Sequence, residues 1–111
     1  MVIRMETSPQ GITVWLTGEL DHHAARMLRE QIDSAIDRYN AKCLHLDFSG
    51  VGFMDSSGIG LIMGRYRLMQ SKGGQLRVVG ASDRLLRVMK LAGLERLPVW
   101  DTTDKQEVHP R

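Results

Sequence analysis

The sequence contains one cysteine and no long apolar run, and both shortages narrow the class of protein. Cys43 is the only cysteine among the 111 residues. A single cysteine excludes an internal disulfide framework and a cysteine-only metal site, and it is typical of a reducing compartment. No apolar stretch approaches the roughly 18 residues of a membrane span, and residues 1–10 lack the apolar core of a signal peptide. We therefore expect a cytoplasmic protein that does not interact with a membrane.

Excess charge and aromatic side chains are also scarce. Lys and Arg number 15 and Asp and Glu number 13, so the formal net charge is only +2. Nucleic-acid-binding domains normally carry a dense cationic face, so we expect no nucleic acid partner. Aromatic residues make up 5% of the chain and hydrophobic residues 42%, which predicts an aliphatic core. A chain of this length and composition is expected to fold as one domain over residues 1–111.

The spacing of apolar residues predicts alternating strands and helices. Strict alternation predicts strands over residues 2–7, 12–17, 43–48 and 75–80. Steps of three and four, together with helix-capping residues, predict helices over residues 21–39, 57–72 and 82–91. Asp21 or His23 is expected near the N-cap of the first helix, and Gly73 and Gly93 are expected to end the second and third.

The end of the chain gives weaker signals. Residues 94–100 are predicted to form a fifth strand at an edge of the sheet, because Pro98 cannot donate a hydrogen bond to a central ladder. Residues 102–111 form a short terminal segment in which Thr103 and Gln106 have the spacing of a capping box. The order of elements predicts an α/β fold with a mixed, mostly parallel sheet of four or five strands and three to four helices.

Three glycines within the second predicted helix require an explanation. Gly58, Gly60 and Gly64 each cost about 1 kcal/mol relative to alanine in a helix interior. Close packing of this helix against the sheet or another helix is the interpretation that we favour. Their spacing resembles a dinucleotide-binding fingerprint with one residue too many, and the surrounding long βαβ unit is missing, so we do not expect a nucleotide cofactor.

The segment Asp55-Ser56-Ser57-Gly58 leads from a strand into a helix N-terminus and is the most informative stretch. Its serines could cap the helix, act as an enzyme nucleophile, or accept a phosphate. The nucleophile elbow G-x-S-x-G is absent, because Met54 or Asp55 stands where its first glycine belongs. Capping by Ser56 or Ser57 and regulated phosphorylation both remain open on these residues alone.

Metal binding and a cationic contact face are weaker interpretations. One candidate metal site is the run Asp21-His22-His23, but adjacent side chains on a helix point about 100° apart and make a poor site. The other candidate consists of Cys43 and His45, which would need further ligands. Polarity at a helix start explains these residues, so we expect neither a metal nor another cofactor. A cationic stripe is formed by Arg84, Arg87 and Lys90. This stripe is typical of a solvated helix face, with contact to an acidic partner or a phosphate as the alternative.

Two longer motifs resemble the anti-sigma factor antagonist family, whose members are single STAS domains. The motifs are Gly18-Glu19-Leu20-Asp21-His22-His23-Ala24 and Phe53-Met54-Asp55-Ser56-Ser57-Gly58-Ile59-Gly60, followed by Gly64-Arg65-Tyr66. The second motif is specific to these antagonists, and the first resembles the corresponding motif in members of the sporulation branch. The resemblance extends over residues 12–100. Family members usually close with a longer helix than residues 102–111 allow.

The resemblance implies a partner switch and no enzymatic activity of the chain itself. It implies that the unmodified protein binds an anti-sigma factor that is also a serine kinase, with ATP or ADP bound, and so frees a sporulation sigma factor. Phosphorylation at Ser56 would end this binding, and a metal-dependent serine phosphatase would restore it. The partner-binding residues that it implies are Asp21, His22, Asp55, Ser57, Gly58, Ile59 and Arg65. Three alternatives remain: a STAS module that binds a nucleotide or other small ligand, an antagonist in a stress response, and a hydrolase that uses Ser56 or Ser57.

Overall fold

The chain folds around a four-stranded sheet, which the computed structural model describes with its flanking helices for residues 1–100. The strands, which lie side by side in sequence order, are β1 (Val2–Ser8), β2 (Gly11–Leu20), β3 (Cys43–Met54) and β4 (Gln75–Val79). β1 and β2 form the expected antiparallel hairpin, whereas β2, β3 and β4 run parallel. The predicted mixed, mostly parallel sheet is therefore confirmed, with four strands.

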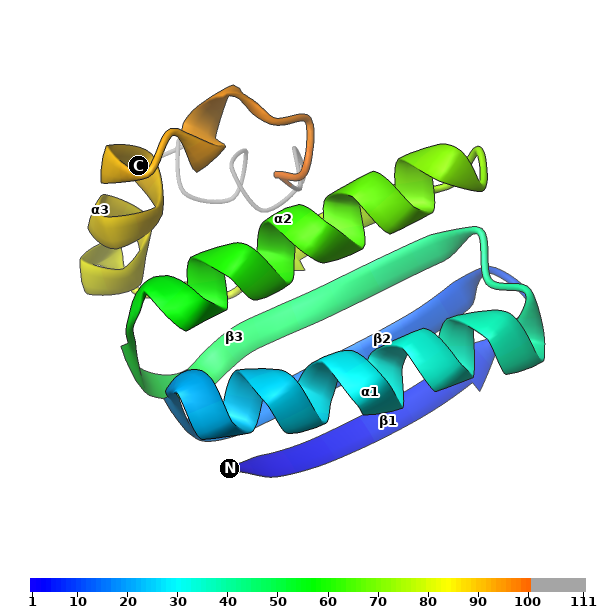
Figure 1. The fold of residues 1–111 in the computed structure, drawn as a ribbon, viewed down its shortest axis with the longest axis horizontal. Coiled ribbons are helices and arrows are strands. Elements are labelled where there is room, and N and C mark those ends of the chain that lie inside the picture. The colour runs from blue at the N-terminus through cyan, green and yellow to red at the C-terminus, as the bar shows by residue number, and fades with distance from the viewer. Residues whose placement is uncertain (101–111) are drawn as a thin grey trace, which may run out of the picture.

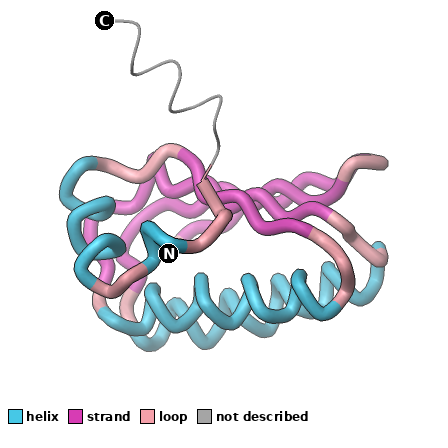
Figure 2. Tube along the Cα trace, turned by 90° about the horizontal axis from the view of Figure 1, so that it is seen from above, coloured by secondary structure: helices cyan, strands magenta, loops and turns pink. Residues whose placement is uncertain are grey.

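Two long helices connect the parallel strands and cover the same face of the sheet (Figures 1 and 2). Helix α1 (His22–Tyr39) leads from β2 to β3, and α2 (Ser56–Ser71) leads from β3 to β4. A third helix, α3 (Asp83–Leu91), is capped by Ser82, whose Oγ accepts a hydrogen bond from the N–H of Leu85 at 3.2 Å. A single 3₁₀ turn, η1 (Leu94–Arg96), follows. None of the described helices is long and apolar enough to span a bilayer.

The core lies between the sheet and helices α1 and α2. Alternate residues of the central strands point into it, and Leu44, Leu46 and Phe48 of β3 are fully buried. Helix α1 contributes a stripe at steps of four, formed by Leu28, Ile32 and Ile36. Because these side chains are almost all aliphatic, the core agrees with the low aromatic content of the sequence. Burial of each such side chain stabilises the fold by about 1.5–3 kcal/mol.

Strand β3 is longer than the predicted strand over residues 43–48, because it includes residues 49–54, whose glycines are typical of a loop. The strand continues to Met54, paired in parallel with β2 as far as Leu20. Glycines suggested a loop, but Gly50 permits a close approach: a Cβ at that position would lie 2.7 Å from the carbonyl oxygen of Leu16. The β3 strand therefore extends to the start of α2, and only Asp55 lies between them.

The predicted fifth strand over residues 94–100 is wrong. Gly93, at a positive φ of 86°, ends the α3 region, and η1 follows with Leu94 buried. Pro98 has no N–H for a ladder, and pairing with β4 is limited to a single bridge between Val78 and Trp100.

Helix α2 also begins and ends one residue earlier than predicted. The terminal segment 102–111, with Thr103 and Gln106, lies outside the described residues.

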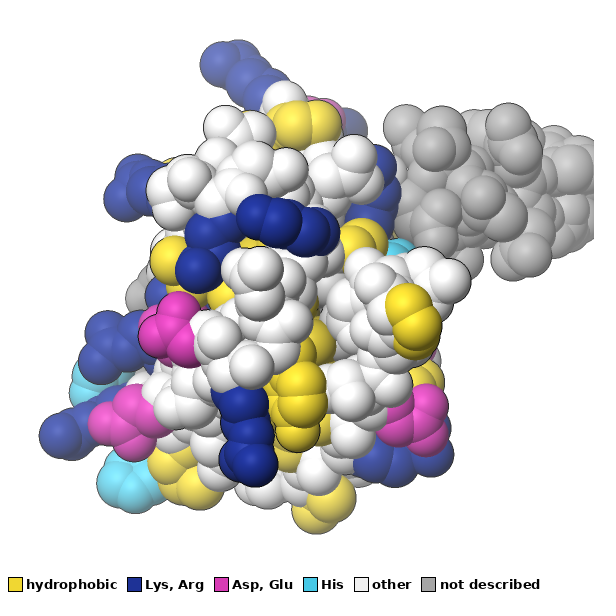
Figure 3. All heavy atoms as spheres, turned by 90° about the vertical axis from the view of Figure 1, so that its right-hand side faces the viewer, with side chains coloured by type: hydrophobic (Ala, Val, Ile, Leu, Met, Phe, Trp, Pro, Cys, Tyr) yellow, Lys and Arg dark blue, Asp and Glu magenta, His cyan; other side chains and the backbone are white. Residues whose placement is uncertain are grey.

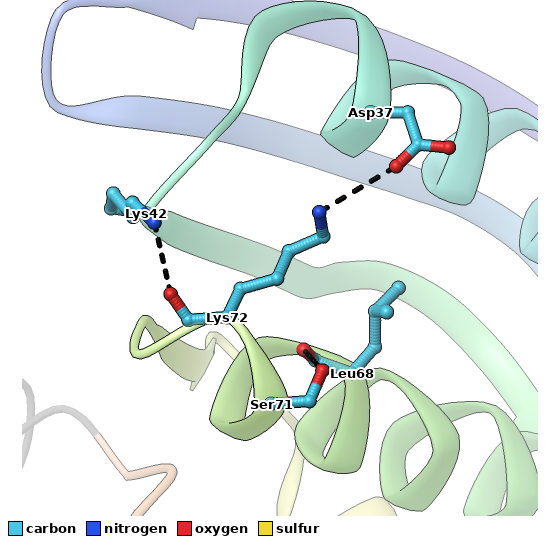
Figure 4. A network of polar contacts seen from close by, with 5 residues as sticks. All are labelled: Asp37, Lys42, Leu68, Ser71 and Lys72. Carbon is cyan, nitrogen blue, oxygen red and sulfur yellow. Dashed lines mark hydrogen bonds and ion pairs between the residues drawn. The ribbon is translucent and has the colours of Figure 1, made fainter.

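Polar contacts join the carboxyl ends of α1 and α2 to the start of β3 (Figure 4). The Nζ of Lys72 lies 3.6 Å from Oδ1 of Asp37, and the Nζ of Lys42 donates to the carbonyl oxygen of Lys72 at 2.9 Å. At this end of the molecule, charged side chains of both signs are interspersed with apolar ones (Figure 3). Exposed ion pairs of this kind contribute about 0–1 kcal/mol each. The polar residues of the sequence motifs lie at the opposite end.

Candidate functional site

The two sequence motifs meet where β2 and β3 end. Leu20 and Met54 are paired as the last residues of these neighbouring parallel strands, and the N–H of Asp55 donates to the carbonyl oxygen of Leu20 at 3.3 Å. Asp21 and Asp55 therefore follow adjacent strands, and helices α1 and α2 begin beside one another (Figure 1). In open α/β sheets, the carboxyl ends of the strands are where binding sites usually form.

Each of these helices is capped by an aspartate. Oδ1 of Asp21 accepts from the N–H of Ala24 at 2.9 Å, and Oδ1 of Asp55 accepts from the N–H of Ser57 at 2.8 Å. The N-cap residue of α1 is therefore Asp21 and not His23. Of the two interpretations that the sequence left open for the serines, capping is excluded, because α2 begins at Ser56 and Asp55 has the extended backbone of an N-cap residue.

Because Asp55 provides the cap, the two serine hydroxyls have no capping role. Neither Ser56 Oγ nor Ser57 Oγ hydrogen-bonds to another residue within 1–100. Ser56 is exposed at the first position of α2, and Ser57 is half-buried on the side that faces α1. The Ser56 hydroxyl is therefore accessible to a partner or a modifying enzyme, and its modification breaks no hydrogen bond of the described fold.

The negative charge of the Asp21 cap is favoured by its surroundings. The hydrogen bond from the backbone N–H of Ala24 lowers the pKa of Asp21, and its proximity to His23 acts in the same direction. Asp21 is therefore ionised at neutral pH. A negative charge at a helix N-terminus also interacts favourably with the helix dipole.

The remaining predicted partner-binding residues lie at different depths. His22 is exposed on the first turn of α1, Ile59 is half-buried against the core, and Gly58 is buried. Arg65 is only 7% exposed, and its Nε lies 3.0 Å from Oδ1 of Asp33 on α1. The structure thus brings the first-turn residues of both helices together, whereas Arg65 lies two turns further along α2.

Close packing explains only one of the three helix glycines. A Cβ on Gly58 would lie 2.6 Å from Sδ of Met54 and 3.1 Å from Cδ2 of Leu20, so the first turn of α2 rests directly on the strand ends. A Cβ on Gly60 or Gly64 would have no atom within 4 Å. Close packing is therefore the wrong explanation for Gly60 and Gly64, which instead line an open groove between α1 and α2.

This difference predicts opposite effects of the same substitution on one helix. Gly58→Ala is expected to lower the free energy of unfolding by about 1–3 kcal/mol, because the methyl group must displace the buried Met54. Gly60→Ala is expected to raise it by about 0.5–1 kcal/mol, because alanine favours the helix and nothing obstructs its Cβ. Urea denaturation of both variants measures the two values. Equal effects of the same sign would contradict this packing.

The groove between α1 and α2 has a volume of about 580 Å³. Its α1 wall carries His22, Arg26 and Arg29, and its α2 wall carries Ser57, Gly60, Gly64 and Arg65. The neighbouring His23 lines a different pocket, beside β1 and Glu19. The two histidines therefore face different sides. Within residues 1–100, no group of three or more His, Cys, Asp or Glu side chains converges as metal ligands.

Phe53 is a candidate for partner contact that sequence reasoning did not single out, although the residue belongs to the quoted motif. Phe53 precedes Met54 near the end of β3, and its side chain is 48% exposed. Phe53 lies two residues before Asp55, the N-cap of α2. A large, half-exposed aromatic side chain at this position is suited to contact with a partner. The alternation of buried residues ends at Phe48, and the next buried positions are Val51 and Met54, so alternation alone could not have indicated that Phe53 is exposed.

Comparisons with known proteins agree with this architecture. The STAS domain family model matches residues 2–106. An anti-sigma F factor antagonist of Paenibacillus polymyxa is 40% identical over 100 residues, covering 89% of this chain and 86% of that protein. An anti-sigma-B factor antagonist of Bacillus subtilis strain 168 is 28% identical, covering 84% of each.

Two solved structures of SpoIIAA have the same fold. The anti-sigma factor antagonist SpoIIAA in its unphosphorylated form is 31% identical, with a TM-score of 0.80, covering 90% of this chain and 86% of that chain. The Bacillus cell fate determinant SpoIIAA in its phosphorylated form is also 31% identical, with a TM-score of 0.73. The match covers 90% of this chain and 89% of that chain.

The fold and the family match define the class of the protein as a STAS domain. The chain belongs to the anti-sigma factor antagonists of this family, of the sigma F or sigma B type. Members of this group are regulators that act by binding an anti-sigma factor and are not enzymes. The expected family membership and the expected class of function are thus confirmed at this level.

Proposed function

We propose that the chain is the antagonist in a sporulation partner switch controlled by a phosphate on Ser56. The unphosphorylated form binds an anti-sigma factor that is also a serine kinase, with ATP or ADP bound, and thereby frees the sigma factor. The kinase transfers a phosphate to Ser56, the modified antagonist dissociates, and a serine phosphatase regenerates it. The whole chain, residues 1–111, acts as one domain in the cytoplasm.

The observation that carries this proposal is the state of the Ser56 hydroxyl. It is exposed at the first position of α2 and unbonded within the described residues, because Asp55 has taken the capping role. His22 is exposed at the start of the neighbouring α1, and Phe53 is exposed three residues before Ser56. SpoIIAA, which has the same fold, is known in unphosphorylated and phosphorylated forms.

The charge of the phosphate opposes binding more than it opposes folding. A phosphoserine carries a charge of about −1.5 to −2 at neutral pH, which brings the net charge of the chain from +2 to about zero. Within the chain, the N-terminus of α2 attracts this charge and Asp55 repels it, so the two effects largely cancel. A partner that covers Ser56 must instead strip the water from the dianion, which costs several kcal/mol.

The substitution Asp21→Asn separates the proposed partner-binding role of Asp21 from its capping role. Asparagine caps about as well as aspartate but lacks its charge, so the melting temperature at pH 7 is expected to fall only slightly below that of the wild type. Because the pKa of Asp21 is lowered by folding, its charge stabilises the native state above about pH 4, and this contribution is lost in acid. The variant should therefore lose less stability on acidification, measured by thermal melting across pH.

The functional readout of Asp21→Asn is the affinity for the anti-sigma factor. We expect weaker binding or slower phosphorylation, because Asp21 lies beside Asp55 at the partner-facing strand ends. If binding and phosphorylation both stay at the wild-type level, Asp21 is a helix cap and nothing more.

The proposed function is tested by reconstitution of the switch with the anti-sigma F factor and sigma F of the same organism. Addition of the unphosphorylated chain to their complex should release the sigma factor, detected by gel filtration. Release of sigma B from its own anti-sigma factor instead would favour the stress-response alternative, which the similarity to the Bacillus subtilis antagonist supports. Binding of a free nucleotide by the isolated chain, without release of a sigma factor, would support the small-ligand alternative.

A further inference from the structure

We propose that the groove between α1 and α2 receives an acidic side chain of the anti-sigma factor, next to the contact made around Ser56. This inference rests on the proposed function and adds a second, charge-selective contact to it. The groove adjoins the switch serine, because Ser57, the next residue, lines its α2 wall. A partner that covers Ser56 can therefore reach into the groove.

The charge of the groove fits a carboxylate. Arg26, Arg29 and Arg65 line it, and no aspartate or glutamate does. Arg26 and Arg29 are exposed and lie one turn apart on α1, so they form a cationic rim. Arginine pairs with carboxylates through two parallel hydrogen bonds, which gives such a rim selectivity as well as attraction.

Arg65 is the second observation that indicates a ligand. Its side chain is more than nine-tenths buried, and its guanidinium donates no hydrogen bond to any other residue within 1–100. The approach of Asp33 Oδ1 to Nε, at 3.0 Å, is an ion pair without hydrogen-bond alignment. Burial lowers the pKa of Arg65, and nearby Arg29 acts in the same direction, whereas Asp33 raises it. An acidic group in the groove supplies the missing acceptors.

The two unexplained glycines provide the space for this contact. Gly60 and Gly64 lie one turn apart on the α2 wall, and a Cβ on either would meet no atom of the chain within 4 Å. Each costs the isolated helix about 1 kcal/mol relative to alanine. Absence of side chains at these positions leaves the α2 backbone open to a partner segment that carries the acidic residue.

The test uses the full chain and the anti-sigma F factor of the same organism with ADP, titrated by calorimetry. Gly64→Met fills the groove, and Arg26→Glu reverses its charge. Both variants are expected to bind at least about tenfold more weakly than the wild type. Arg67→Glu is the matched control: it makes the same charge change at an exposed position of α2 that does not line the groove, and its affinity should stay within about twofold. Circular dichroism and thermal melting verify that each variant is folded.

The outcomes separate this proposal from the proposed function. If the wild type releases no sigma factor and binds no anti-sigma factor, both fail. If the wild type binds and the folded Gly64→Met binds equally well, only the groove proposal fails. An equal loss in Arg67→Glu and Arg26→Glu would mean general charge attraction and would overturn the specific contact. Binding of inorganic phosphate or ATP to the isolated chain, abolished by Arg26→Glu, would make the groove a small-anion site instead.

Discussion

Phosphorylation of Ser56 is expected to weaken binding to the anti-sigma factor by at least about a hundredfold while leaving the fold nearly unchanged. The acceptor hydroxyl is exposed and makes no hydrogen bond within the described residues, so the phosphate displaces nothing from the core. Desolvation of a dianion in an interface costs several kcal/mol, and about 1.4 kcal/mol corresponds to a tenfold change in affinity. Calorimetric titration of the two forms measures the difference.

Heteronuclear NMR spectra of the same two forms test whether the fold is retained. We expect chemical-shift changes confined to residues near Asp21 and to the first turn of α2. Changes that spread through β1 to β4 would mean that phosphorylation acts through refolding, which would contradict a switch at the interface. Ser56→Asp should weaken binding only partly, because aspartate has one charge and a shorter reach than phosphoserine.

Ser56→Ala is expected to abolish phosphate uptake and to leave binding largely intact. The variant should fold like the wild type, because Asp55 and not Ser56 caps α2. It should therefore remain permanently in the binding-competent form and keep releasing the sigma factor in the presence of ATP. Phosphate incorporation from labelled ATP and gel filtration with the anti-sigma factor measure the two properties.

Ser57→Ala is the matched control for this variant. Ser57 has the same chemistry one position along α2, yet it is half-buried and faces the groove. We expect Ser57→Ala still to accept one phosphate, on Ser56, with a change in rate no larger than its loss from the groove wall causes. Stoichiometric phosphorylation of Ser56→Ala would contradict the assignment of the switch to Ser56. Loss of phosphorylation only in Ser57→Ala would contradict it as well.

Hydrophobic periodicity was sufficient to predict most of the fold, because each central element buries one face. The alternation around Leu44, Leu46 and Phe48 and the steps of four along α1 correspond to fully buried side chains. The end of β3 could not be predicted in this way. Its glycines are typical of loops, and only the pairing with β2 shows that Gly50 serves a close approach within the sheet.

The site was predictable in its position but not in its internal division of roles. The motifs placed Asp21 and Asp55 at helix starts, yet the capping role of Asp55 depends on where α2 begins, and a shift of one residue exchanges the roles of cap and acceptor. Similarly, the sequence could not distinguish the packed Gly58 from the open Gly60 and Gly64. That distinction depends on which neighbours, Met54 and Leu20 or the groove, the fold places beside each glycine.

The most direct test of the central claim is to locate the phosphate on the wild-type chain. The unmodified protein is incubated with the anti-sigma F factor of the same organism and ATP, and the product is mapped by tandem mass spectrometry. We predict one phosphate per chain, carried by Ser56 at the first position of α2. A phosphate on Ser57 or on any other residue, or a chain that binds the kinase without accepting a phosphate, would contradict the switch proposed for this protein.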